Sequence, residues 1–277
     1  MRFSFKTAQQ DTTWRNLEAF WREADDIDVF YQGWLFDHFR PLMSEPDGPC
    51  YEAWTVAAGV AAVTGRLRIG HMVTANTFRH PALAAKMAVT VDHISNGRVD
   101  FGLGTGWLDE EHEAYGIDLP PLAERFDRFD EALEVVYRLF TETSPTYEGV
   151  HYQLKDALFE PKAIQRPHIP IVIGGRGERR TLRAVARYAA HYNYPGWDLE
   201  DFRRKLDVLA TRCSEFDRDL STIHTSIQVR LDSDYSIIAE RAHEAAEAGA
   251  KELIICIPPP HEVAVLDPLA RVLGACR

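Results

Sequence analysis

The amino-acid sequence predicts an α/β fold, and within that class a (β/α)8 TIM barrel formed as a single domain by residues 1–277. Short apolar segments alternate with segments of helical periodicity eight times, and no change of composition divides the chain. Residues 67–107 contain a strand, a helix and a second strand, which is a βαβ unit with parallel strands. A doubly wound open sheet is the alternative, but its usual G-x-G-x-x-G after the first strand is replaced by KTAQQ at 6–10.

Each expected element has its own signal in the sequence. The strands are short and largely apolar, and are expected at 2–6, 29–36, 67–74, 99–103, 169–173, 190–194, 223–231 and 252–257. The helices are expected at 12–24, 51–63, 82–94, 122–140, 178–188, 199–216, 236–248 and from 261 onward. Residues 108–121 and 147–161 lack a clear period. We therefore expect an insertion over the barrel mouth after the fourth strand and a surface hairpin or loop before the fifth.

The third expected helix, at 82–94, has signals at both ends and along its length. Pro81 suits the first turn of a helix, and Asn96-Gly97 tolerates the left-handed conformation that ends one. Apolar residues recur at helical spacing, so the helix is expected to bury the face formed by Leu83, Met87, Val91 and Ile94.

Charge and composition exclude several classes of partner. The net charge of −11 argues against nucleic acid and against an anionic membrane surface, since both require clustered Lys and Arg. No apolar run approaches the roughly 20 residues of a membrane span. The four cysteines are scattered without a C-x-x-C pair, and the N-terminus, MRFSFKT, shows no secretory leader. The chain is therefore expected to be cytoplasmic, with reduced thiols.

In a barrel of this kind the chemistry belongs to residues that follow the strands. Asp37 and His38 follow the second strand and are the only adjacent acid and imidazole at any expected strand end. The functional interpretation is a proton donor tuned near neutrality. In the structural alternative, Asp37 caps a turn and His38 packs in the interior. The position at the barrel mouth favours the functional interpretation.

Glycines follow the fourth and fifth strands. Gly104-Thr105-Gly106 ends one, and Gly174-Gly175-Arg176-Gly177 ends the next, just before a helix expected from Glu178. Glycines allow the backbone to approach a ligand, and a helix N-terminus offers free N–H groups to an anion. Arg176, Arg179 and Arg180 add positive charge, so this corner is a candidate phosphate site rather than a turn alone.

The insertion supplies further candidates in WLDEEH at 107–112. Glu110 or Glu111 is a possible second acid or base, with most of this run forming a charged lid. His191 and Asn193 are taken to follow the sixth strand, where they either line the pocket or have a structural role.

Several kinds of chemistry find no support in the sequence. Lys6 is the only lysine at the end of an expected strand, so an aldolase that forms a Schiff base is poorly supported. No carboxylates follow strands three to five for magnesium, no metal-ligand spacing is present, and no G-x-S-x-G elbow occurs, so no metal is expected. A barrel mouth with few charged side chains suits an enzyme whose bound cofactor, rather than its side chains, supplies the reactive groups.

Five motifs together resemble the luciferase-like monooxygenase superfamily, and most closely its branch that uses the deazaflavin coenzyme F420. They are WLFDHF at 34–39, RHPALAAKMA at 79–88, VDHISNGR at 91–98, GLGTGW at 102–107 and IGGRGERRTL at 173–182. The resemblance covers residues 1 to about 193, and the final third is only generically similar. The family fold is a (β/α)8 barrel, in agreement with the alternation above.

The resemblance implies a site for each part of the coenzyme. The ring would rest on a bulge after the third strand that contains a non-proline cis peptide at Met72-Val73, with the phosphate at the glycine corner. The cofactor-binding residues implied are Met72, Val73, Thr74, Ala75, Asn76, Thr105, Gly106, Trp107, Gly174, Gly175, Arg176 and Gly177. The catalytic residues implied or inferred are His38, Asp37 and Glu110, and the substrate pocket is assigned to Trp34, His191 and Asn193.

The function expected from the resemblance is hydride transfer between coenzyme F420 and an unidentified small organic substrate, with His38 as proton donor or acceptor. Leu42 and Trp107 depart from the pattern of the sugar-phosphate dehydrogenases of this branch, which makes that assignment doubtful. Two alternatives remain: an FMN-dependent two-component monooxygenase supplied by a flavin reductase, and a non-catalytic flavin-binding barrel. A flavin or F420 reductase would supply the reductant, and a homodimer is implied. Substrate selectivity is assigned to the loops at 43–49 and 108–121.

Overall fold

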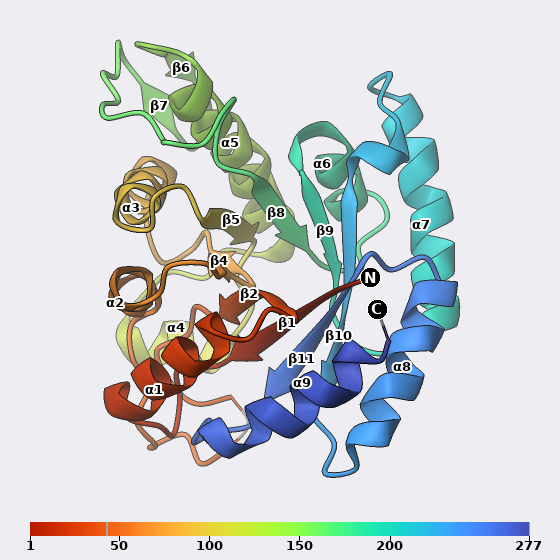
Figure 1. Ribbon diagram of the computed structural model, residues 1–277. Coiled ribbons are helices and arrows are strands. Elements are labelled where there is room, and N and C mark those ends of the chain that lie inside the picture. The colour runs from red at the N-terminus through yellow and green to blue at the C-terminus, as the bar shows by residue number, and fades with distance from the viewer. Residues whose placement is uncertain (43, 277) are drawn as a thin grey trace.

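The computed structural model describes residues 1–42 and 44–276 (Figure 1). Met43, the first residue of the loop expected to contribute to substrate selectivity, lies outside the described residues.

A closed barrel of parallel strands forms the centre of the molecule (Figure 1). The strand order is β3-β2-β1-β11-β10-β9-β8-β5, and pairing of β3 with β5 closes the sheet, while β4 continues beside β5. The predicted (β/α)8 barrel is confirmed. Its strands are β1 (Arg2–Thr7), β2 (Phe30–Leu35), β3 (Arg68–His71), β4 (Thr74–Ala75), β5 (Val99–Gly104), β8 (Ile171–Gly174), β9 (His191–Tyr194), β10 (His224–Arg230) and β11 (Glu252–Ile257).

Helices surround the barrel and cover the outer faces of its strands (Figure 1). They are α1 (Trp14–Asp25), α2 (Ala53–Val63), α3 (Pro81–Ile94), α4 (Asp109–Tyr115), α5 (Leu122–Thr141), α6 (Thr181–Tyr188), α7 (Leu199–Ser214), α8 (Tyr235–Glu247) and α9 (Leu266–Gly274), with 3-10 turns at Leu220–Thr222 and Val263–Val265. The insertion after the fourth barrel strand contains α4, and β6 (Tyr147–Glu148) pairs with β7 (Gln153–Leu154) as an antiparallel hairpin. Within the described ranges no helix is both long and apolar enough to cross a membrane.

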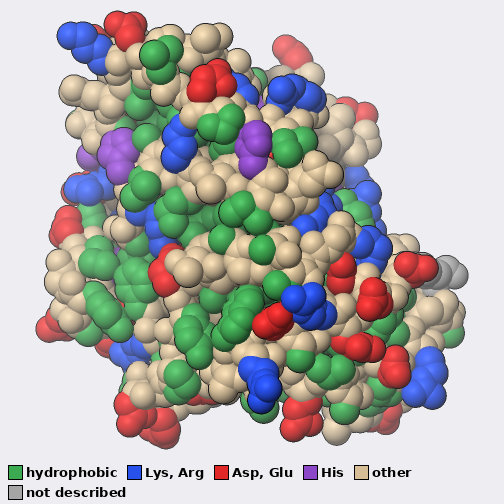
Figure 2. Space-filling view, turned by 60° about the vertical axis from the view of Figure 1, so that its left-hand side comes forward, with side chains coloured by type: hydrophobic (Ala, Val, Ile, Leu, Met, Phe, Trp, Pro, Cys, Tyr) green, Lys and Arg blue, Asp and Glu red, His purple; other side chains and the backbone are tan. Residues whose placement is uncertain are grey.

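Helix α3 buries only part of the face that periodicity predicted: Val91 is buried and Met87 packs against the core. Leu83 and Ile94 are 53% and 45% exposed, so their assignment to the core was wrong. The buried face is made mainly of alanines, which allow α3 to lie close to α2 and α5. Figure 2 shows the side of the molecule on which these helices lie, where hydrophobic side chains are interspersed with charges of both signs.

The barrel interior is filled at its centre and open at its ends. Trp34, Met72, Val172 and Ile254 form a separate buried cluster inside the barrel, packed against Val73. This plug divides the mouth, at the C-terminal ends of the strands, from the opposite end. Functional groups of such barrels lie at the mouth, so the position of a residue along its strand decides which end it can serve.

Candidate functional site

A β-bulge shapes one side of the barrel mouth. Gly70 of β3 pairs with Asp100 of β5, and Thr74 of β4 pairs with Leu103. Four steps along one chain (74 − 70) therefore match three along the other (103 − 100), which leaves one extra residue. The peptide bond between Met72 and Val73, inside this bulge, is a non-proline cis bond, as the resemblance implied.

Two glycines of β5 make room for the bulge. A Cβ on Gly102 would lie 1.9 Å from the carbonyl oxygen of His71, and one on Gly104 would lie 2.5 Å from Cγ2 of Val73. The first of these contacts is with backbone, which cannot move aside as a flexible side chain can. The alternation of glycine in GLG at 102–104 is thus a consequence of the close approach of the two strands.

A hollow of about 200 Å³ lies against the bulge at the barrel mouth, and we call it the bulge cavity. It combines the bulge, the glycine-rich end of β5, the end of β2 and the first turn of α4. Its lining residues are Asp37, His38, Met72, Val73, Ala75, Phe78, Gly104, Thr105, Gly106, Trp107, Leu108, Glu111, His112 and Gly174.

His38 and Glu111 form a pair at the edge of the bulge cavity. Nδ1 of His38 lies 2.8 Å from Oε2 of Glu111, and the two side chains are 13% and 0% exposed. The other oxygen of Glu111 accepts from the backbone N–H groups of Phe39 and Arg40. Burial raises the pKa of the Glu111 carboxyl, but the hydrogen bonds from His38 and from these backbone groups outweigh it, and the net pKa is lowered.

The glutamate determines which nitrogen of His38 carries a proton. Because an ionised carboxylate only accepts hydrogen bonds, Nδ1 of His38 carries the hydrogen. Nε2 has no hydrogen-bond partner in residues 1–42 and 44–276, and His38 lines the bulge cavity. The rings of Trp107 and Phe36 flank the imidazole at centroid distances of 5.7 and 5.2 Å. This arrangement leaves one imidazole nitrogen available to a bound molecule.

Asp37 performs a different task from its neighbour. Its fully buried carboxylate lies 2.5 Å from Nη1 of Arg79 and accepts at 2.8 Å from the backbone N–H of Ala75 in β4. The expected pairing of Asp37 with His38 is therefore corrected: the acid beside His38 is Glu111. Asp37 instead fixes the position of β4, and Arg79 neutralises its charge.

Residues 110 and 111 differ in their surroundings although they are adjacent. Glu110 is exposed on α4, while Glu111 is buried. The structure therefore corrects the choice of Glu110 as a catalytic residue. The sequence offered the two carboxylates together and gave no means of choosing between them.

The three residues assigned to the substrate pocket lie below the mouth. Trp34 belongs to the central plug, and its indole N–H donates to Glu252 at 3.3 Å. His191 is the first residue of β9, so it lies at the end opposite the mouth, where its Nε2 meets Oγ of Ser226 at 2.7 Å. The assignments of Trp34 and His191 to the pocket are thus corrected. Asn193 is buried in the interior and accepts from Nε2 of Gln228 at 2.7 Å.

The other expected cofactor residues lie around the bulge. Ala75, Thr105, Gly106 and Trp107 line the cavity, and Trp107 is 58% exposed. Thr74 and Asn76 are buried, and in the described chain Oγ1 of Thr74 and Oδ1 of Asn76 have no hydrogen-bond partner. Nδ2 of Asn76 donates to the hydroxyl of Tyr152 at 3.2 Å.

The glycine corner after β8 carries less free charge than the sequence suggested. The exposed guanidinium of Arg176 binds the carboxylate of Asp201 at 2.6 Å and lies over the ring of Tyr194. Gly174 borders the bulge cavity, and Gly175 has a positive φ of 138°. Helix α6 begins at Thr181 without a side-chain cap, three residues after the expected start. The backbone N–H groups of this corner, rather than Arg176, are therefore its candidates for binding an anion.

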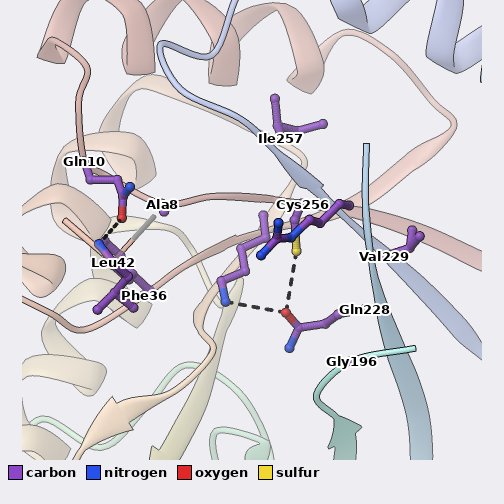
Figure 3. Close-up of a pocket in the computed structure, with 11 residues that line it drawn as sticks. Ala8, Gln10, Phe36, Leu42, Gly196, Gln228, Val229, Cys256 and Ile257 are labelled. Atoms are coloured by element: carbon purple, nitrogen blue, oxygen red, sulfur yellow. Dashed lines mark hydrogen bonds between the residues drawn. The ribbon is translucent and has the colours of Figure 1, made fainter. Parts of the chain in front are cut away.

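A second hollow of about 230 Å³, which we call the mouth groove, opens at the ends of β1, β10 and β11 (Figure 3). Its walls are mainly apolar, with a few polar and charged groups. It is lined by Lys6, Ala8, Gln10, Phe36, Leu42, Gly196, Gln228, Val229, Arg230, Cys256 and Ile257.

Sequence reasoning gave no role to two residues that shape this site, Arg79 and His112. Arg79 holds Asp37, and His112 bonds Oγ1 of Thr77 through Nε2 and the carbonyl oxygen of Leu108 through Nδ1, both at 2.7 Å. Arg79 stands in a motif used for the resemblance, but its role depends on a contact with a residue 42 positions earlier.

Known proteins share both the sequence pattern and the fold. The luciferase-like monooxygenase family matches residues 2–271. The pyrimidine monooxygenase RutA of Allorhizobium ampelinum is 35% identical over 147 residues, which is 52% of this chain and 39% of that protein. An F420-dependent glucose-6-phosphate dehydrogenase of Microbacterium testaceum is 32% identical over 235 residues, 83% of this chain and 68% of that protein.

Solved structures agree with the fold. An F420-dependent secondary alcohol dehydrogenase, solved in complex with an F420-acetone adduct, superimposes with a TM-score of 0.86 at 17% identity, covering 100% of this chain and 99% of that one. An EDTA monooxygenase from Chelativorans superimposes with a TM-score of 0.83 at 12% identity, covering 99% and 94%. With a match that spans nearly all of its residues and a barrel that carries the expected bulge, the chain belongs to the luciferase-like monooxygenase family.

Proposed function

We propose that this protein is a coenzyme F420-dependent oxidoreductase that moves hydride between the deazaflavin and a small organic substrate, with His38 as the proton donor or acceptor. The observation that carries the proposal is the bulge cavity itself. The bulge and the glycines make a flat surface next to the imidazole of His38. Nδ1 of this imidazole is bonded to the buried carboxylate of Glu111, and Nε2 is left free to meet a ligand. Relatives that use F420 and cover most of this chain support the choice of coenzyme.

The residues around the bulge fit such a coenzyme. Gly104 and Gly106 keep the floor of the cavity free of side chains, and Met72 and Val73 present the surface on which a ring would rest. The unpartnered oxygens of Thr74 and Asn76 are buried polar atoms close to the bulge, where a ligand group would satisfy them. The backbone N–H groups of Arg176 and Gly177 would hold the phosphate, because that of Gly175 already donates to the carbonyl oxygen of Asn193.

Coenzyme F420, when bound, supplies or accepts the hydride, and the protein supplies the proton. With Nδ1–H committed to Glu111, neutral His38 presents the lone pair of Nε2 to the bulge cavity and accepts a proton there. Protonated His38 donates from the same atom, and the Glu111 carboxylate stabilises the imidazolium. Trp107, Leu108 and His112 cover the cavity from the α4 side and limit the access of water.

Two other functions make different use of the same cavity. An FMN-dependent monooxygenase, supplied by a flavin reductase, is the second candidate, because relatives include the pyrimidine monooxygenase and an FMNH(2)-dependent dimethylsulfone monooxygenase of Pseudomonas putida, which is 24% identical over 204 residues. A non-catalytic binding barrel is the third. The buried His38–Glu111 pair favours an enzyme over this third function.

Titration of the purified protein with F420 and with FMN tests the proposal. We expect F420 fluorescence to be quenched at micromolar coenzyme, with weaker or no binding of FMN. Absence of F420 binding overturns the proposal, and tighter binding of FMN favours the monooxygenase. Turnover of a panel of alcohols, aldehydes and acids by wild type and by His38→Asn then separates an enzyme from a binding protein, because a passive barrel would show no activity that depends on His38.

A homodimer and a cytoplasmic location complete the proposal. The dimer follows from the resemblance, and the exposed Leu83 and Ile94 of α3 are apolar side chains available for contact. The four cysteines are all unpaired thiols, which suits a reducing compartment. Light scattering on the eluted protein gives the oligomeric state, and fractionation of cells gives the location.

A further inference from the structure

We propose that the mouth groove binds a substrate that carries a carboxylate on a small apolar body, with Lys6 and Arg230 binding the carboxylate. This inference rests on the proposed function, because it assigns the substrate class to the second half of the same barrel mouth. The bulge cavity and the mouth groove together would hold the two reactants.

The two cations lie in one row across neighbouring strands. Lys6 of β1 is the register partner of Cys256 in β11, and Cys256 is in turn the register partner of Arg230 in β10. Residues at matching register in adjacent strands point to the same face of the sheet. Ile254, two residues before Cys256, belongs to the barrel-interior plug, so this row faces the interior just above the plug. Both cations therefore border one opening.

Neither cation has an anionic partner. In residues 1–42 and 44–276 no carboxylate lies within ion-pair distance of Lys6 or Arg230, although the chain carries 42 acidic residues against 31 basic ones. Among the described residues, the only polar contact of the Lys6 ammonium is the amide oxygen of Gln228 at 3.5 Å. Arg68, Arg79 and Arg176 are paired with aspartates, whereas Lys6 and Arg230 line one hollow and are both left available to a ligand. Two unpaired cations at one hollow are complementary to a bound anion.

Gln228 is held in place beside Lys6. Its Nε2 donates to Oδ1 of Asn193 at 2.7 Å, and its oxygen faces Lys6 and the thiol of Cys256 (Figure 3). The bond to Asn193 fixes the amide so that its neutral oxygen faces Lys6 at the long distance of 3.5 Å, which leaves the charge of the ammonium uncompensated. An external carboxylate would satisfy both cations without disturbing this network.

The rest of the groove is apolar and suits a hydrocarbon body. Ala8 and Phe36 are buried residues on its wall, and Leu42 lies at its rim (Figure 3). A fully hydrophilic anion such as a sugar phosphate would leave these groups in contact with polar atoms. The composition of the wall therefore favours an acid with an alkyl or aryl group.

Phe36 connects the groove to the proton donor. It lines the mouth groove, and its ring centroid lies 5.2 Å from that of His38, which lines the bulge cavity. A molecule bound by its carboxylate at Lys6 and Arg230 would thus extend along Phe36 toward His38. Its far end, rather than its carboxylate, would be the reacting part.

Cys256 offers a competing interpretation, as a reactive thiol between two cations. Lys6 and Arg230 both act to lower its pKa, but burial dominates and the net pKa is raised. A buried protonated thiol is a poor nucleophile. The row is better explained as an anion site than as a redox centre.

Calorimetric titration with hexanoate, and with the neutral hexanamide as its matched probe, tests the proposal on the protein without coenzyme. We expect hexanoate to bind at least roughly tenfold more tightly than hexanamide, because charge-assisted contacts are lost with the amide. Lys6→Gln and Arg230→Gln should each weaken hexanoate by a similar factor. Lys155→Gln, an exposed lysine of the β6–β7 hairpin, should leave the affinity unchanged. Circular dichroism of each variant verifies that it folds.

The outcomes separate this inference from the proposed function. Equal affinity for hexanoate and hexanamide, no binding of either, or hexanoate binding that survives both cation variants overturns the carboxylate site. Tighter binding of butyl phosphate than of hexanoate also overturns it, in favour of a phosphate ester. If hexanoate binds as expected but F420 does not, the anion site stands and the oxidoreductase proposal fails. If F420 binds and hexanoate does not, the substrate class alone is wrong.

Discussion

Substitution of Glu111 by glutamine isolates what one buried carboxylate contributes to the His38 site. The oxygens of Glu111 accept three hydrogen bonds, from Nδ1–H of His38 and from the N–H groups of Phe39 and Arg40. Glutamine offers one acceptor oxygen and one NH2 donor group. In either orientation of the amide, therefore, a donor of the protein faces another donor.

The expected cost follows from the burial of the pair. Each buried donor that loses its acceptor costs about 1–3 kcal/mol. The Glu111→Gln variant should lose about that much free energy of unfolding, measured as a lower urea midpoint at unchanged slope. Where the NH2 group faces the imidazole, His38 must accept through Nδ1, and its proton moves to Nε2. Histidine ring 15N chemical shifts, assigned with His38→Asn, report this change of tautomer.

The neighbouring Glu110→Gln is the matched control. It removes the same charge one residue earlier, from the exposed side of α4. We expect it to keep the unfolding midpoint and the ring shifts of wild type. A Glu111→Gln variant that also keeps both would refute the assignment of Glu111 as the partner of His38, and with it the account of the proton donor.

Three further predictions address the bulge, the buried ion pair and the closed end of the barrel. Gly104→Ala places a Cβ 2.5 Å from a valine methyl of the bulge, so it should cost about 1–3 kcal/mol and weaken F420 binding, whereas Gly274→Ala, with open space around it, should change neither. Arg79→Gln leaves a fully buried carboxylate unpaired and should lower stability by about 3–5 kcal/mol in thermal or urea unfolding, while Arg22→Gln on the surface should have little effect. Burial lowers the pKa of His191 to about 3, so the unfolded chain binds more protons than the folded one between that value and about 6.5. Stability should therefore rise with pH across this window by up to about 1.4 kcal/mol per unit, and His191→Asn should reduce that slope in urea unfolding measured at several pH values.

The barrel could be predicted from local pattern in the sequence, the bulge was implied by the resemblance to a family, and His38 was singled out by its place after a strand. Alternation of apolar strands and amphipathic helices indicates parallel α/β pairing wherever it occurs. The glycines at 102 and 104 and the motif around His38 are likewise continuous stretches of sequence. Their positions did not depend on knowing which distant residue lies beside them.

The wrong predictions concern which face of a helix is buried and at which end of the barrel a strand residue lies. Leu83 and Ile94 fit a helical period, but alanines gave α3 its closest packing, so size rather than hydrophobicity selected the buried face. His191 was assigned to the mouth although it begins its strand. That error was avoidable, since the first residue of a barrel strand lies at the end away from the mouth.

By itself, then, the sequence determined the barrel class and the place of His38 after a strand, because these follow from periodicity and from residues close together in the chain, and its motifs implied the bulge through the resemblance to a family. Only the tertiary structure decided that Glu111 rather than Glu110 or Asp37 holds His38, because successive residues of a helix point about 100° apart. It also decided that Asp37 belongs to Arg79 and that Lys6 and Arg230 share one opening. Those pairings join residues far apart in sequence, and closure of the barrel brings them together.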